Sequence, residues 1–301
     1  MNSSNSLGGV ASIHAATLAV GMAGLFGKFL EHSPVLITQG RSTIAALALA
    51  VVLSLQRKRP RLSGCQWFWL AVTGGILAAH WVTFFHAIQV STVAIGLLSF
   101  SSYPLFTTLI EPWVFRERLR PIHLGFALAV MVGIALIATS ESGNSANPDA
   151  PDVLLGVGWG LVSGFTLAVL TILNRLHVQT HSPLLISCTQ NGFAALALLP
   201  FSAGLNWHLD GRDWSLLLAL GLICTAGGYA LFLHGLQRVR AQLASLILAG
   251  MESVYAILFA MLLLSEIPSL QTVLGGIFII GTTVVASFQS SEPTTPTVNS
   301  G

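Results

Sequence analysis

Charged residues are scarce in this chain. Of its 301 residues, 13 are Lys or Arg and 11 are Asp or Glu, so that 8% carry charge, whereas a soluble domain has about 25%. The apolar fraction is 53% and the mean hydropathy is +0.78. A chain with so little polar surface cannot face water on all sides. It is predicted to be an integral membrane protein, with the lipid bilayer as its surroundings and no nucleic-acid partner.

Cysteine is equally scarce, and the usual enzyme signatures are missing. Cys65, Cys188 and Cys224 are widely spaced, with no CxxC pair and no histidine cluster at metal spacing. Neither a metal site nor a disulfide framework is indicated, and no cofactor is expected. The sequence contains no HExxH, no GxSxG and no pair of aspartates inside an apolar block. An intramembrane enzyme is therefore disfavoured, and so is a channel, because nothing resembles a filter or a ring of like residues.

Short polar segments divide the sequence into ten apolar blocks of about 20 residues, the length that crosses a ~30 Å hydrocarbon core as a helix. The blocks are continuous and do not alternate between apolar and polar residues, as the strands of a membrane barrel do. The predicted fold class is an all-α membrane protein with ten transmembrane helices. The predicted spans are 10–30, 34–55, 66–88, 91–112, 122–140, 153–174, 183–203, 213–234, 241–263 and 270–288.

The positions of the basic residues predict the orientation of the chain. Ten of the thirteen Lys and Arg residues lie in connections that fall on the same side of the membrane, at 57–61, 116–120, 175 and 238–240. Under the positive-inside rule, this side is the cytoplasm. We therefore expect a multi-pass protein of the bacterial cytoplasmic (inner) membrane with both termini in the cytoplasm.

The chain contains two copies of one module. Phe84-x-His86-x-x-Gln89 returns as Phe232-x-His234-x-x-Gln237, and the His-Ser-Pro step at 32 returns at 181. The 141–152 connection is rich in turn formers and separates a first repeat, 1–145, from a second, 146–288, while 289–301 is predicted to be a disordered tail. Because each repeat holds five helices, the second must run in the opposite direction to the first. Inverted repeats of this kind are typical of secondary transporters.

Several residues at matching places carry a resemblance to a known family. Pro34 and Arg41 stand early in the second span, the Tyr103-Pro104 step lies thirteen residues before Glu117, and Glu252 has a comparable place in the second half. Together with the 5+5 layout, these features resemble the drug/metabolite transporter superfamily, in its ten-helix branch with two EamA-type domains. Gln190 and Ser253 are departures, because they stand where the first half has Arg41 and Pro104.

That resemblance implies a secondary transporter that works by alternating access. Members with this layout export amino acids and related metabolites, and the best known are bacterial aromatic amino-acid exporters. The chain is accordingly expected to export amino acids or related small metabolites and to function as a monomer. A carrier of another small metabolite or drug is the alternative.

Polar and aromatic side chains at helical spacing predict which faces of the helices look inward. They are expected to line a water-filled cavity near the middle of the membrane, although for any single Ser or Thr a hydrogen bond between helices is the competing interpretation. The candidate substrate-binding residues are Glu252, Tyr103, His80, Trp81, Tyr229, Tyr255, Ser99, Gln190, Asn191, Trp159 and Ser163.

The ionisable residues in or near the spans allow specific predictions of position and role. Glu252 lies about 16 Å along a helix that begins near Ala241, which places its carboxyl near the midplane. We expect it to bind the ammonium group of an amino acid and to lie near Tyr103; the alternative is a protonated carboxyl bonded to the helix of 153–174 or of 183–203. Arg41 is expected to extend toward the lipid headgroups. Glu117 and Glu266 are expected to cap or pair at helix ends.

Overall fold

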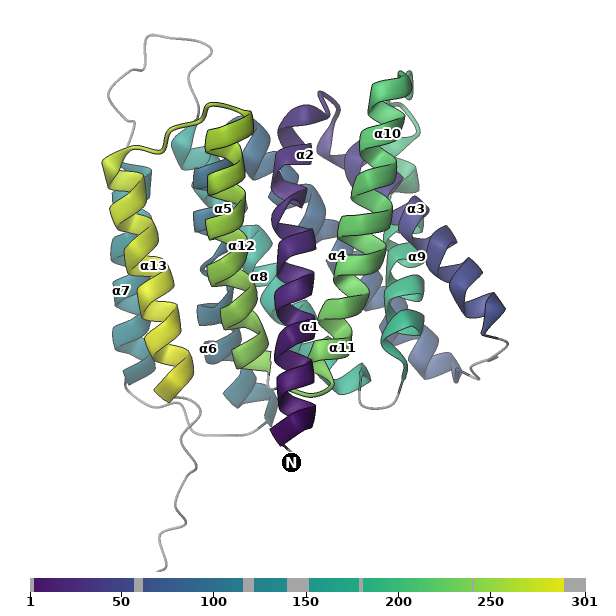
Figure 1. Cartoon of the computed structure of the whole chain (residues 1–301), viewed down its shortest axis with the longest axis horizontal. Helices are drawn as coiled ribbons and strands as arrows, with labels where there is room; N and C mark the ends of the chain where they lie inside the picture. Colours follow the sequence, from purple (N-terminus) through teal and green to yellow (C-terminus); the bar gives the residue numbers. More distant parts are fainter. Residues whose placement is uncertain are drawn as a thin grey trace, which may run out of the picture.

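The computed structural model describes residues 3–56, 62–115, 122–139, 152–178, 181–239 and 241–289, and their regular structure is entirely helical. Seven helical runs are long and apolar enough to cross a membrane, and three further apolar stretches are shorter, which makes ten in all. They coincide with the ten predicted spans. The all-α membrane fold is therefore confirmed (Figure 1).

The first five spans are formed by α1 to α7. Span 1 consists of α1 and α2, span 2 is α3, span 3 is α4, span 4 consists of α5 and α6, and span 5 is α7. Their bounds are Ser3–Gly21, Ala23–Phe29, Pro34–Leu55, Gly64–Val90, Val93–Phe100, Tyr103–Phe115 and Ile122–Ala138.

The second five spans follow the 141–152 connection. Span 6 is α8, span 7 is α9, span 8 combines α10, η1 and α11, span 9 is α12 and span 10 is α13. Their bounds are Val153–His177, Pro183–Ser202, Gly211–Ala219, Leu220–Tyr229, Ala230–Leu236, Ala241–Leu263 and Leu270–Gln289. Five passes precede the connection, so α8 runs opposite to α1 and the repeats are inverted.

Two spans that were predicted as continuous helices are broken. Span 1 is interrupted at Met22, between α1 and α2. Span 4 is interrupted at Ser101 and Ser102, just before Pro104, which has no N–H to continue the backbone hydrogen bonds. Both serines donate their hydroxyls back to the preceding turn, at Leu97 O and Ser99 O, which also accept from the backbone N–H of the same serines.

Equivalent residues of the two repeats make the same helix caps and hydrogen bonds. The Ser33 and Ser182 hydroxyls accept from the backbone N–H three residues on, and each N-caps a helix that begins with proline. Gln89 donates its amide to His32 O at 2.9 Å, beyond the end of α2, and Gln237 donates to Val178 O at 2.8 Å, beyond the end of α8. The repeated glutamine therefore ties the end of span 3 or 8 to the end of span 1 or 6.

The repeats interlock through their middle helices. Along the centre of the bundle α3 packs against α9, and α4 packs against both α8 and α9. In the same manner α1 packs against η1 and α11. Each of these helix contacts therefore joins one repeat to the other.

The π-helix η1 corrects the predicted uninterrupted α-helix over 213–234. Spans 3 and 8 both open on a capping box, with Ser63 and Asp210 as N-caps 147 residues apart. At their far ends Gln89 and Gln237 are 148 residues apart. Span 8 thus carries one extra residue between two fixed ends. A π-helix bonds i to i+5 in place of i to i+4 and so accommodates that residue without misaligning either end.

The predicted domain limits and tail remain predictions. The 141–151 part of the connection, Glu117 and residues 290–301 lie outside the described residues, and Asp152 N-caps α8 by accepting from Leu155 N.

Candidate functional site

A small cavity lies between the two repeats. Its volume is about 30 Å³, which is enough for one or two water molecules and too small for an amino acid, so the site is closed in this conformation. Aromatic rings dominate the wall, and the polar groups are an imidazole, a phenol and a carboxyl. The lining residues are Val20, Leu77, His80, Trp81, Phe100, Leu167, Tyr229, Phe232, Leu248 and Glu252. Four of them, His80, Trp81, Tyr229 and Glu252, belong to the predicted substrate-binding set.

His80 is fixed to α8 by its hydrogen bonds. Its Nδ1 lies 2.9 Å from Ser163 Oγ and 3.2 Å from Ser163 O, and the Ser163 hydroxyl lies 3.1 Å from His80 O. The His80 ring also packs 4.7 Å from the Trp81 ring. Ser163 therefore orients His80 at the cavity wall.

Gln190 closes a hydrogen-bonded ring that includes Tyr229 of the cavity wall. The Tyr229 hydroxyl donates to Gln190 Oε1 at 2.7 Å and accepts from Asn174 Nδ2 at 2.7 Å. Gln190 Nε2 donates to Asn174 Oδ1 at 2.6 Å and to Thr73 Oγ1 at 2.8 Å. Four spans meet in this ring. Asn174 and Thr73 were not predicted, although helical spacing could have found them: Asn174 lies three residues after Thr171, and Thr73 lies seven residues before His80.

Arg41 contradicts the expectation that it extends to the headgroups. Its side chain is fully buried, with Cζ 3.6 Å from the centroid of the Trp81 ring and 5.4 Å from that of Phe85. Its Nε donates to Thr225 Oγ1 at 2.8 Å. The position in the sequence could have revealed this burial: Arg41 lies seven residues inside α3, about 10 Å from its start, and is the repeat mate of Gln190.

Glu252 is 2% exposed, and its Oε2 has no hydrogen-bond partner among the described residues. Its carboxyl interacts electrostatically with the Arg41 guanidinium. The acid therefore lines the small cavity, and the base, which comes from the other repeat, lies against the Trp81 ring of its wall.

Five other predicted residues lie outside the cavity lining. Tyr103 is buried and stacks on Phe100 at 5.2 Å, one ring away from the cavity. Ser99 is buried against Gly160, and Tyr255 is half-buried beside Gly21. The two remaining residues point elsewhere: Asn191 donates to Ser187 O of its own helix, and the Trp159 ring meets the His86 ring at 5.1 Å.

The predicted capping role of Glu266 is confirmed. Its Oε2 accepts from Val93 N at 2.8 Å, at the first residue of α5. In α6, which continues the span that begins with α5, Glu111 pairs with Arg175 of α8. Both carboxylates therefore join one repeat to the other.

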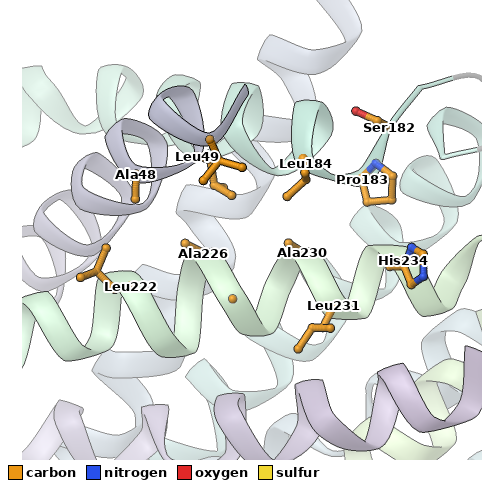
Figure 2. Close-up of a pocket in the computed structure, with 12 residues that line it drawn as sticks. Ala48, Leu49, Ser182, Pro183, Leu184, Leu222, Ala226, Ala230, Leu231 and His234 are labelled. Atoms are coloured by element: carbon orange, nitrogen blue, oxygen red, sulfur yellow. The ribbon is translucent and has the colours of Figure 1, made fainter. Parts of the chain in front are cut away.

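A larger cavity lies elsewhere. It is a groove of about 580 Å³ between α3, the start of α9 and the η1–α11 segment, and Figure 2 shows its lining of alanine, leucine and proline side chains. Its only polar side chains, Ser182 and His234, lie together at one end. A groove without converging polar groups is a poor receptor for a polar solute. The small central cavity is the candidate site because the buried Glu252 carboxyl lines it and the buried Arg41 guanidinium lies against its Trp81 wall.

Known proteins match the chain along most of its length. It is 25% identical over 177 residues to the uncharacterized transporter YxxF of Bacillus subtilis, a match that covers 58% of this chain and 55% of that protein. It is 27% identical over 223 residues to an uncharacterized transporter of Archaeoglobus fulgidus, covering 72% and 74% respectively. The chain thus spans about half the length of the Bacillus relative and about three quarters of the Archaeoglobus relative.

A crystal structure of a protein that is 22% identical shares the fold, with a TM-score of 0.64 over 97% of this chain and 100% of the other. The EamA-like transporter family matches residues 7–139 and 154–288, which are nearly the whole of both repeats. The chain therefore belongs to the EamA-like transporter family and is a membrane transporter of small molecules.

Proposed function

We propose that this transporter exports amino acids or related small metabolites across the bacterial inner membrane, with both termini in the cytoplasm. The observation that carries the proposal is the buried Glu252 carboxyl at the central cavity, whose Oε2 has no partner among the described residues. A charged side chain at the middle of a membrane costs at least ~2.5 kcal/mol. The ammonium group of a substrate would supply the charge and the hydrogen bonds that this carboxyl lacks.

The cavity wall supports a substrate with an apolar or aromatic side chain. Trp81, Phe100, Tyr229 and Phe232 surround the space next to Glu252. Both repeats contribute to this wall, as expected of a transporter that exposes one midplane site to the two sides in turn. The small volume supports a closed state between the two open ones. In this mechanism the monomer is sufficient and no cofactor is needed. The solute is chemically unchanged, unlike the substrate of an enzyme, and its flux saturates, unlike the flux through a channel.

A carrier of another small metabolite or drug with a cationic group is the second candidate. The same carboxyl and the same apolar wall favour it. The two candidates differ in whether the substrate also needs a carboxylate.

The test is flux through the purified protein in proteoliposomes, measured with a panel of radiolabelled amino acids. Glu252→Gln keeps the shape and removes the charge, and we expect it to lower the affinity for an ammonium-bearing substrate by about tenfold or more. Glu266→Gln is the matched control, because Glu266 caps α5, and its flux should stay close to wild type. Unchanged affinity and rate in Glu252→Gln would refute the assignment.

A further inference from the structure

Arg41 and Gln190 occupy equivalent positions of the two repeats and make equivalent contacts. Each meets the aromatic residue of the next span in its own repeat, Trp81 or Tyr229. Each also donates to a threonine of the opposite repeat: Arg41 to Thr225 on η1, and Gln190 to Thr73 on α4. The packing role at this position is therefore satisfied by an uncharged amide.

The two residues differ in how many of their side-chain polar atoms have a hydrogen-bond partner. Gln190 uses its amide nitrogen and its oxygen in the ring with Asn174 and Tyr229. Arg41 uses only Nε, and its Nη1 and Nη2 have no hydrogen-bond partner among the described residues. A fully buried guanidinium with two unsatisfied nitrogens is costly, and a second buried glutamine would avoid that cost. The charge at position 41 thus requires a reason beyond packing.

The guanidinium lies directly behind the wall of the central cavity. Its Cζ is 3.6 Å from the centroid of the Trp81 ring, which lines that cavity together with His80 and Glu252. Because Thr225 occupies Nε, the edge that stays available is the pair Nη1 and Nη2. A planar pair of N–H donors matches the two oxygens of a carboxylate.

We infer that Arg41 is the carboxylate-binding residue of the substrate site, so that the transported solute is a zwitterion held between Arg41 and Glu252. This assignment rests on the proposed function, in which Glu252 binds the ammonium group of the solute. It adds that the same solute must also carry a carboxylate, which Arg41 binds. An amine without a carboxylate would leave the guanidinium unsatisfied. A zwitterion satisfies both buried charges at once and enters the membrane with no net charge.

The test combines two variants with three probes that share one side chain. Full-length protein in nanodiscs is titrated with phenylalanine, with phenethylamine, which lacks the carboxylate, and with 3-phenylpropionate, which lacks the ammonium. For wild type we expect both truncated probes to bind about tenfold or more weakly than phenylalanine. Arg41→Gln, which copies the residue of the other repeat and so preserves packing, should bind phenylalanine and phenethylamine equally.

Glu252→Gln should show the reciprocal pattern and lose only the discrimination against 3-phenylpropionate. Arg41→Lys keeps the charge without the paired donors, and its discrimination should lie between wild type and Arg41→Gln. Full discrimination against phenethylamine in Arg41→Gln would overturn the assignment. If wild type bound 3-phenylpropionate in an Arg41-dependent way but gained nothing from the ammonium, the proposed function would fail and the anion site would stand. If no probe bound in an Arg41-dependent way, the anion site would fail.

Discussion

Neighbouring amides in α9 show that the partners of a polar residue decide its contribution. Gln190 bonds to Thr73, Asn174 and Tyr229, which lie on three other spans. Asn191 bonds only to Ser187 O in its own helix, and its Oδ1 has no partner among the described residues. The first residue therefore joins helices, and the second does not.

Gln190→Ala should destabilise the protein. It leaves the Tyr229 hydroxyl without its acceptor and Asn174 Oδ1 without its donor in a buried site, and each unsatisfied group costs roughly 1–3 kcal/mol. Hydrogen bonds between membrane helices average only ~0.6 kcal/mol, which favours the lower end of that range for each group. We expect a total loss of about 2 kcal/mol, measured by unfolding in detergent.

Asn191→Ala is the control for this loss, since it removes a buried oxygen that has no partner. Its stability should stay within about 0.5 kcal/mol of wild type. Equal losses at positions 190 and 191 would contradict the role assigned to the ring.

Single polar residues could be located from the sequence only where the helical period repeats them. Ser99, Tyr103, Thr107 and Glu111 follow one another at a spacing of four residues, and all four are buried; the midplane position of Glu252 was counted from the start of its helix. Arg41 was misjudged because a basic residue early in a span is compatible with a headgroup contact. Only the tertiary structure places the Trp81 ring beside it and Thr225 across from it.

At the scale of elements, the spans were predictable because lipid forces each apolar block of about 20 residues into a helix. The breaks were not. The extra residue of span 8 is visible only once the capping boxes and the repeated glutamines fix the two ends of the comparison. The π-helix that absorbs this residue carries Thr225, whose hydroxyl donates to Leu220 O five residues back and accepts from Arg41.

Deletion of Gly227 should remove the extra residue and return η1 to an α-helix. Both ends of the span keep their anchors, at the Asp210 capping box and at Gln237, so the variant should insert and fold. Thr225 should lose its bond with Arg41, and a hydrogen bond to a charged group contributes roughly 1.5–3 kcal/mol. Substrate affinity should fall about tenfold or more in a binding assay.

Deletion of Ala79 is the matched control. This residue lies at the corresponding level of α4, where no extra residue is available to remove. The deletion must rotate one end of that helix by about 100° relative to the other, as 3.6 residues per turn requires. We expect the variant to misfold, as judged by size-exclusion profile. Normal folding of both deletion variants, with unchanged affinity, would show that η1 is not a positioning element.

For the whole molecule, inversion of the repeats makes the two faces of the bundle comparable. On the face opposite the N-terminus, where α2 and the start of α10 lie in Figure 1, His32 Nε2 is 2.8 Å from Asp213 Oδ2. The equivalent pair on the other face is His181 and Gln66. His181 Nε2 has no partner among the described residues, and Gln66 accepts from Ser63 N. The two faces are therefore held differently in this conformation.

Alternating access in an inverted-repeat protein follows when the two repeats exchange conformations. We expect the His32–Asp213 contact to break and His181 to approach Gln66 when the transporter opens to the opposite side. In a background without Cys65, Cys188 and Cys224, bridging His32→Cys to Asp213→Cys with a short bifunctional thiol reagent should hold the present state and stop flux. Bridging His181→Cys to Gln66→Cys should be slow without substrate, faster during transport, and equally inhibitory. If short bridges closed across both pairs at once in one molecule, the two faces would not alternate. The inverted repeats would then not exchange conformations during transport.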